Sequence, residues 1–206
     1  PPAALDNPLL SPDLLAYAVR AVDAAARESA PALTPALQLL SLHCLDRRAQ
    51  AALLENKAFK RVLRLAAQLL ETRLLEPLSA ALHVLAKLTH ANGPGQRYFL
   101  AQRGKALLGR ALALELPGDC PALDGLFCAA AHCCAENDFQ LHVWASDLLP
   151  PLLDAAGRPL PLKLVAALAR RCEEVTRDLH GRAGFVQRVL AVAARQDTAT
   201  TEQVLM

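Results

Sequence analysis

The chain has 206 residues, of which 53% are hydrophobic and 4% aromatic, so Leu and Ala must form most of any core. Its 22 Lys and Arg nearly balance its 20 Asp and Glu, and a net charge of +2 without a long basic block gives no support to general nucleic-acid binding. No apolar run approaches the roughly 20 residues that a membrane-spanning helix needs. Period-two runs of Val, Ile, Thr and Tyr are also absent, so the composition predicts an all-α protein.

The first helix is predicted from a start signal near the N-terminus. Ser11 offers a capping hydroxyl, Pro12 follows where no backbone N–H is needed, and Asp13 lies in the first turn. An apolar stripe continues the helix to about residue 27. Thr34-Pro35 repeats the signal and predicts the start of a second helix at residue 35.

A helical unit then recurs at a spacing of roughly 40 residues. Each copy has an Ala/Leu-rich helix, a polar turn, a short helix that opens near Gln or Arg, and a second apolar helix. The markers of the copies are separated by 46, 44 and 37 residues and are Gln50, Gln96, Gln140 and Arg177. This period predicts a stacked helical solenoid, which works by presenting an extended surface.

Two corners of these units carry a family likeness. The segments Leu-Leu-Glu-Asn-Lys-Ala-Phe from Leu53 and Leu-Ala-Gln-Arg-Gly-Lys-Ala-Leu from Leu100 resemble the corner between the first two helices of the armadillo repeat. Gly104 and Gly184 fall where that corner often needs a small residue or a positive φ. The resemblance implies an all-α, right-handed solenoid of about four three-helix units after a partial first unit. Two-helix HEAT repeats remain the alternative.

The resemblance also implies where each helix of the unit lies. The short first helices are expected at residues 49–56, 96–102, 139–145 and 176–182. The second helices are expected at residues 59–70, 106–114, 150–155 and 185–194, and the long third helices, which line the concave face, at residues 35–45, 78–90, 122–134 and 162–172. The repeat domain covers residues 9–195, with units at approximately 9–48, 49–92, 93–137, 138–175 and, in part, 176–195. Residues 1–8 are interpreted as a linker remnant and residues 196–206 as a frayed tail.

Many armadillo proteins hold an extended peptide with an asparagine ladder on the third helices, backed by tryptophans one turn earlier. The ladder positions of this chain are Ser41, Lys87, His132 and Arg170. The preceding-turn positions hold His83, Cys128 and Ala166 instead of tryptophan, so the resemblance does not carry over that clamp. The partly basic row, with His83 one turn before Lys87 as a further partner-binding residue, predicts a concave groove for an acidic or amphipathic segment of a protein partner. The alternative is a solvated helix face, because the nearby acidic residues Asp124, Glu173 and Glu174 dilute the charge.

Two other groups of side chains suggest sites. Trp144 is a secondary candidate anchor for a partner, although a tryptophan on a short helix more often seals the seam between two repeats. Cys128 and His132 share a helix face, but Cys133 and Cys134 point about 100° apart, so four converging zinc ligands are not expected. The six cysteines are interpreted as reduced core residues, which together with the absence of glycosylation sites predicts an intracellular protein of the cytoplasm, the nucleus or both.

Catalysis has little support in the sequence. Neither a Gly-x-Ser-x-Gly motif nor a phosphate-binding loop with its Lys-Ser/Thr occurs. We expect no catalytic residues, no cofactor, no metal and no small-molecule substrate. The sequence therefore favours a non-catalytic protein–protein interaction domain, a scaffold or adaptor. The alternatives are a structural capping or oligomerisation domain that makes contacts through its open repeat ends and, least favoured, an enzyme.

Overall fold

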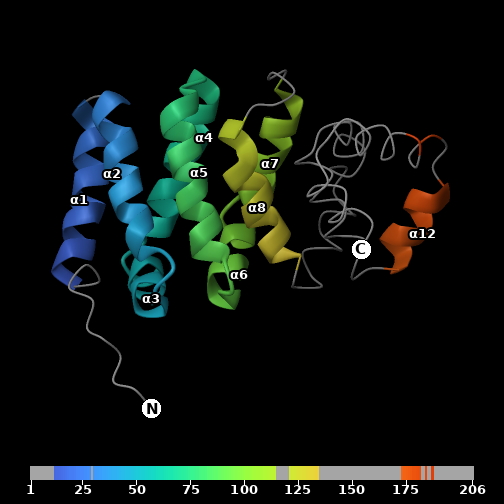
Figure 1. The fold of residues 1–206 in the computed structure, drawn as a ribbon, viewed down its shortest axis with the longest axis horizontal. Coiled ribbons are helices and arrows are strands. Elements are labelled where there is room, and N and C mark those ends of the chain that lie inside the picture. The colour runs from blue at the N-terminus through green and yellow to red at the C-terminus, as the bar shows by residue number, and fades with distance from the viewer. Residues whose placement is uncertain are drawn as a thin grey trace, which may run out of the picture.

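The computed structural model describes residues 12–28, 30–114, 121–134 and 173–181, together with the single positions 184 and 187. Across these residues the regular structure is helical and no strand occurs (Figure 1). The predicted all-α class is therefore confirmed for the described part of the chain. No helix in that part combines the length and the apolar character that crossing a bilayer requires.

The first two helices are α1 (Pro12–Glu28) and α2 (Ala30–His43), which pack against each other. α1 starts at the predicted proline and carries Asp13 in its first turn. α2 begins earlier than expected, and Pro35 lies inside it, so the start predicted at Pro35 is wrong. Pro31 occupies the first turn of α2, where its missing N–H costs nothing, whereas Pro35 removes one i→i−4 hydrogen bond.

Two successive groups of helices then follow the same order. The first group is the short α3 (Arg47–Glu55), then α4 (Ala58–Thr72) and α5 (Leu75–Thr89). The second group is the short α6 (Gly93–Ala101), then α7 (Gly104–Ala113), a 3-10 turn at Pro121–Leu123 and α8 (Asp124–Cys133). All of these bounds agree with the predicted helices to within a few residues.

One more helix, α12 (Glu173–Gly181), lies close to the short helix predicted at residues 176–182. The helices predicted at residues 139–145, 150–155 and 162–172 lie outside the described residues, and so do the linker remnant, the tail and, except for position 187, the helix predicted at residues 185–194.

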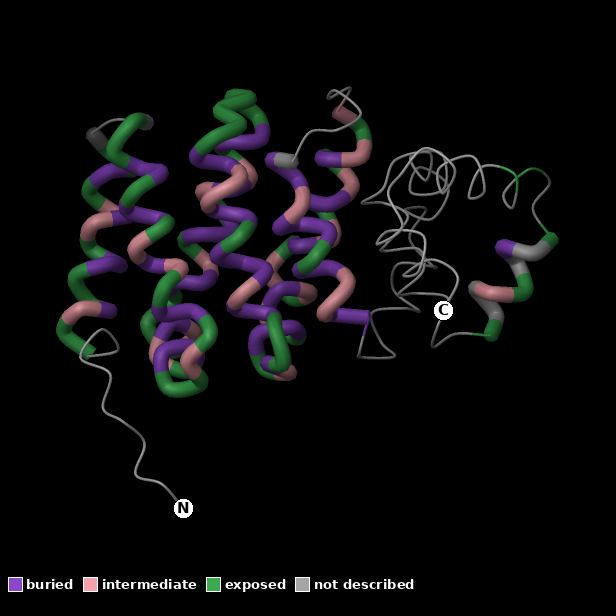
Figure 2. The backbone as a smooth tube through the Cα atoms, in the orientation of Figure 1, coloured by how far each residue is buried: buried purple, intermediate pink, exposed green. Residues whose placement is uncertain are grey.

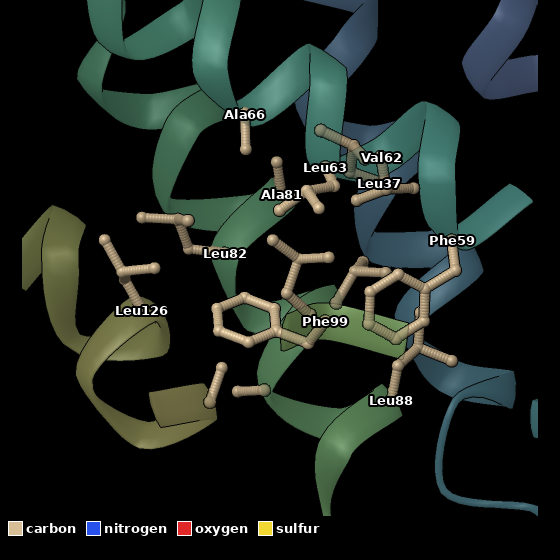
Figure 3. Packing of buried hydrophobic residues seen from close by; sticks show 14 of the residues in the cluster. Leu37, Phe59, Val62, Leu63, Ala66, Ala81, Leu82, Leu88, Phe99 and Leu126 are labelled. Carbon is tan, nitrogen blue, oxygen red and sulfur yellow. The ribbon is translucent and has the colours of Figure 1, made fainter. Parts of the chain in front are cut away.

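Apart from the short α3 and α6, the helices from α1 to α8 form two layers. α2, α5 and α8 lie side by side in one layer, and α1, α4 and α7 pack on them to form the other (Figure 1). The core lies where the helices face one another, and Figure 2 shows the buried residues on these sides. Its largest fully buried side chains include Leu37, Phe59, Leu82, Leu85, Phe99 and Leu126, several of which are seen in Figure 3. As the composition predicts, leucine and alanine make up most of this core.

The two corners that resemble the armadillo repeat share a backbone conformation. Lys57 precedes α4 with φ 61° and Arg103 precedes α7 with φ 71°, and both residues are left-handed. The small residue comes next in each corner. A Cβ on Gly104 would lie 2.5 Å from Cε1 of Phe99, and Ala58 is buried at the matching place. Gly104 is therefore needed for its small size, while the positive φ falls on the residue before it.

Candidate binding face

Lys87 and Ser41, two residues of the predicted row, meet across the seam between α5 and α2. The half-buried Lys87 donates from Nζ to the backbone oxygen of Ser41 at 3.1 Å and to its Oγ at 3.3 Å. Ser41 Oγ in turn donates to the carbonyl of Gln38, 2.8 Å away. The lysine therefore joins two helices of this layer, and we call the solvent-facing side of this layer the α2–α5–α8 face.

His132, the third described residue of the row, joins α8 to α5 in a similar way. Its Nδ1 lies 3.1 Å from the carbonyl of Ala86 and 3.1 Å from Oγ1 of Thr89. Its Nε2 lies 3.4 Å from Nδ1 of His90. Burial lowers the pKa of His132, His90 lowers it further, and the bond to Ala86 partly opposes both effects. His132 is therefore neutral near pH 7 and adds hydrogen bonds, not charge, to the face.

The remaining predicted residues are placed as follows. His83 is exposed on α5 with its Nδ1 2.9 Å from the carbonyl of Ser79, and Cys128 is exposed on α8. Arg170 and Trp144 lie outside the described residues. The structure thus places Ser41, Lys87 and His132 on three neighbouring helices, where Lys87 joins α5 to α2 and His132 joins α8 to α5.

Buried glutamines explain the repeat marker found in the sequence. Gln50 Nε2 donates to the carbonyl of Cys44 at 2.9 Å and to that of Lys87 at 3.1 Å. Gln96 Nε2 donates to the carbonyl of Thr89 at 3.1 Å. The carbonyls of Cys44 and Thr89 lie at the C-terminal ends of α2 and α5, where the helix provides no backbone partner, while the carbonyl of Lys87 also accepts a bond from the backbone N–H of His90 at 3.3 Å. Each glutamine is a capping residue for the preceding helix, a role that the marker spacing alone could not reveal.

A second repeated contact shows which positions of α2, α5 and α8 correspond to one another. A side chain bonds back to the carbonyl four residues earlier at Cys44, Thr89 and Cys134, with distances of 3.2, 3.1 and 3.4 Å. Counting back from these residues, Leu42 occupies the place that Lys87 and His132 hold in α5 and α8. Leu42 is 64% exposed and the nearby Leu45 is 57% exposed. Sequence reasoning missed both leucines because their apolar character suggested a place in the core.

His43 is a buried polar residue without a polar partner. It is 1% exposed, and neither ring nitrogen has a hydrogen bond in the described structure. Its place matches that of the buried Leu88 in α5 and Cys133 in α8. Burial lowers its pKa, and the carboxylate of Asp46 partly opposes this effect. An imidazole therefore fills a position that the next unit fills with leucine.

The cysteines behave as core residues more than as ligands. Cys44, Cys133 and Cys134 are buried, and none of the four described cysteines forms a disulfide. Burial raises the pKa of the Cys44 thiol to about 12, and Lys87 partly opposes this shift. Within the described residues, no three His, Cys, Asp or Glu side chains converge as metal ligands would.

Comparisons with family models, with curated proteins and with solved structures found no match. Function must therefore be inferred from the chemistry of this chain. The α2–α5–α8 face offers one ammonium group, several hydrogen-bonding side chains and two exposed leucines. Such a mixture suits the binding of another chain, because exposed apolar side chains next to polar ones are typical of interaction sites.

Proposed function

We propose that this chain is a non-catalytic protein-interaction domain, a scaffold or adaptor built as a right-handed solenoid of armadillo-like units. The repeated order of α3–α4–α5 and α6–α7–α8 supports this architecture, and so do the matching roles of Gln50 and Gln96. In this proposal the α2–α5–α8 face is the concave face and holds a peptide or helix of a protein partner.

The observation that carries the proposal is the pair of exposed leucines close to Lys87. Leu42 directly follows Ser41, which accepts both described bonds from the Lys87 ammonium. An ammonium has three N–H donors, so one remains for a carboxylate of a partner. A segment that covers Leu42 and Leu45 with apolar side chains and offers an acid to Lys87 would satisfy both needs. The partner segment is therefore amphipathic and acidic.

The proposal is tested with two double variants that remove the same apolar chemistry from different places. Leu42→Ser with Leu45→Ser changes the proposed face. Leu74→Ser with Leu75→Ser is the matched control, because these leucines are 41% and 36% exposed at the turn between α4 and α5. Proteins captured from cell extract by each variant and by the wild type are quantified by mass spectrometry. We expect partners that the first variant loses by about tenfold or more and that the control retains.

A third variant, Lys87→Glu, checks the acidic character of the partner. We expect it to lose the same proteins as the leucine variant, because the introduced carboxylate would repel the carboxylate of the partner. Circular dichroism verifies that each variant keeps its helices. Capture of the same proteins in the same amounts by all three variants and the wild type would show that this face is not the binding face.

A further inference from the structure

The other layer of the molecule contains a hollow between α4 and α7, the two neighbouring helices labelled in Figure 1. Its volume is about 520 Å³. Its accessible apolar lining includes the alanines Ala67 of α4 and Ala106 of α7, while the lining leucines Leu63 and Leu107 are buried in the core. The hollow belongs to α4 and α7 and is separate from the α2–α5–α8 face.

Cationic side chains line this hollow from both helices. They are Lys60 and Arg64 from α4, Arg103 from the corner before α7, and Arg110 from α7. The left-handed backbone at Arg103 places this residue at the start of α7, next to the small Gly104. Among the described residues that line the hollow, none is acidic.

The charge of these four residues is mostly uncompensated. Arg110 pairs with Glu71 at 2.5 Å, from Nη1 to Oε1. In the described part of the chain, no carboxylate lies within ion-pair distance of Lys60, Arg64 or Arg103. Like charges gathered on one surface repel one another, so an anionic partner would relieve this repulsion as well as form new ion pairs.

We propose that the hollow between α4 and α7 binds an acidic amphipathic helix of a protein partner. Apolar side chains of such a helix would pack on Ala67 and Ala106, and its carboxylates would reach Lys60, Arg64 and Arg103. A phosphate backbone matches this surface less well, because it offers nothing to the apolar lining. The proposal is independent of the proposed function, since it uses neither the residues nor the helices of that face.

The test uses a model peptide with fluorescein at one end. The peptide has about 18 residues, or five helical turns, with leucines along one stripe and glutamates beside them. A second peptide has glutamine in place of every glutamate. Fluorescence anisotropy with the full chain at low salt is expected to show binding of the first peptide and at least about tenfold weaker binding of the second. Binding of the first peptide should weaken as salt is raised, because exposed charges are screened.

Two charge-reversal variants then locate the binding site. Lys60→Glu with Arg64→Glu reverses two charges in the hollow and is expected to weaken binding by about tenfold or more. The matched control is Arg47→Glu with Arg48→Glu, which makes the same charge change at exposed positions in the first turn of α3. It should change the affinity less than about twofold. Lys87→Glu, on the other face, should also have little effect, which separates this proposal from the previous one.

Several results would overturn the proposal. They are the absence of peptide binding by the wild type, equal binding of the acidic peptide and its glutamine counterpart, and equal loss of affinity in the hollow variant and the α3 control. Duplex DNA and inorganic phosphate serve as competitors. Displacement of the peptide by DNA at a lower concentration than by unlabelled peptide would instead assign the hollow to nucleic acid. Displacement by millimolar phosphate alone would show a simple anion site.

Discussion

The ends of α2 and α5 are held by the same two kinds of hydrogen bond, but they bury different side chains. At each end a side chain bonds back to the carbonyl four residues earlier, from Cys44 directly after α2 and from Thr89 at the last position of α5. Both ends are capped by a buried glutamine from the next short helix. Next to this shared framework, α2 buries His43 without a polar partner where α5 buries Leu88.

The comparison shows which features of the junction are needed and which are tolerated. The glutamine cap satisfies carbonyls that would otherwise be buried and unpaired, so both junctions retain it. The apolar place beside it can accept an imidazole, but an unpaired buried polar group costs free energy. The α2 junction should therefore be the less stable of the two, and it should be sensitive to pH.

The largest effect is expected when the buried histidine of the α2 junction is introduced at the matching position of α5. Leu88→His loses a fully buried leucine and buries an imidazole, so the free energy of unfolding should fall by about 2–5 kcal/mol. Urea unfolding followed by circular dichroism measures the change. If this variant were as stable as the wild type, a buried imidazole would cost no stability at the α5 junction, and the difference between His43 and Leu88 would not explain a difference in stability between the two junctions.

A smaller effect is expected from removal of the glutamine caps. Gln50→Ala leaves the carbonyl of Cys44 without its side-chain donor and Gln96→Ala does the same to that of Thr89, at a cost of about 1–3 kcal/mol each. The loss should be larger for Gln50, because its amide serves carbonyls at the ends of both α2 and α5. Gln68→Ala on the exposed side of α4 is the control and should change stability by less than about 0.5 kcal/mol. Equal values for Gln68 and Gln50 would contradict the capping role.

The smallest effect at neutral pH is expected from His43→Leu, which should stabilise the protein by about 1 kcal/mol. The variant should also reduce the pH dependence of stability. The pKa of His43 is lowered in the folded state, so below about pH 6.5 the unfolded chain binds more protons than the folded chain. The wild type should therefore be most stable above this pH and lose stability as the pH falls below it.

Urea midpoints at about pH 7.5 and pH 5.5 measure this difference, since the ordinary pKa of histidine lies between them. His132 also has a lowered pKa and should leave some acid sensitivity in the variant. A midpoint that falls equally in the wild type and in His43→Leu would show that His43 does not titrate on unfolding.

The helices themselves could be predicted from the sequence because proline and polar turns mark their ends and the apolar spacing marks their faces. The start of α2 was missed because the Thr34-Pro35 signal looks the same one turn inside a helix as at its beginning. Thr34 is buried, which a sequence pattern does not record. The predicted small residue at Gly104 reflects contact with Phe99, a distance that only the folded chain defines.

The candidate site was predictable only in part. The sequence pattern predicts the row of Ser41, Lys87 and His132, and the structure bonds Lys87 to Ser41 and places His132 on the neighbouring α8. By helix register, however, Leu42 is the residue that matches Lys87 and His132. The bond between Lys87 and Ser41 could not be predicted, because a long lysine side chain can point to solvent or to a neighbouring helix with the same sequence. The hollow between α4 and α7 was missed because its four cations come from two helices and form no basic run in the sequence.

The ion pairs between neighbouring outer helices have a consequence for how the molecule bends. Arg61 joins α4 to Asp23 of α1, and Arg110 joins α7 to Glu71 of α4, both at 2.5 Å and both partly open to water. The other layer is joined by partly buried bonds, from Lys87 of α5 to Ser41 of α2 and from His132 of α8 to Ala86 of α5. Salt weakens exposed ion pairs much more than buried bonds. The molecule should therefore bend about the α2–α5–α8 layer. The layer of α1, α4 and α7 should become less stiff as the ionic strength of the solution rises.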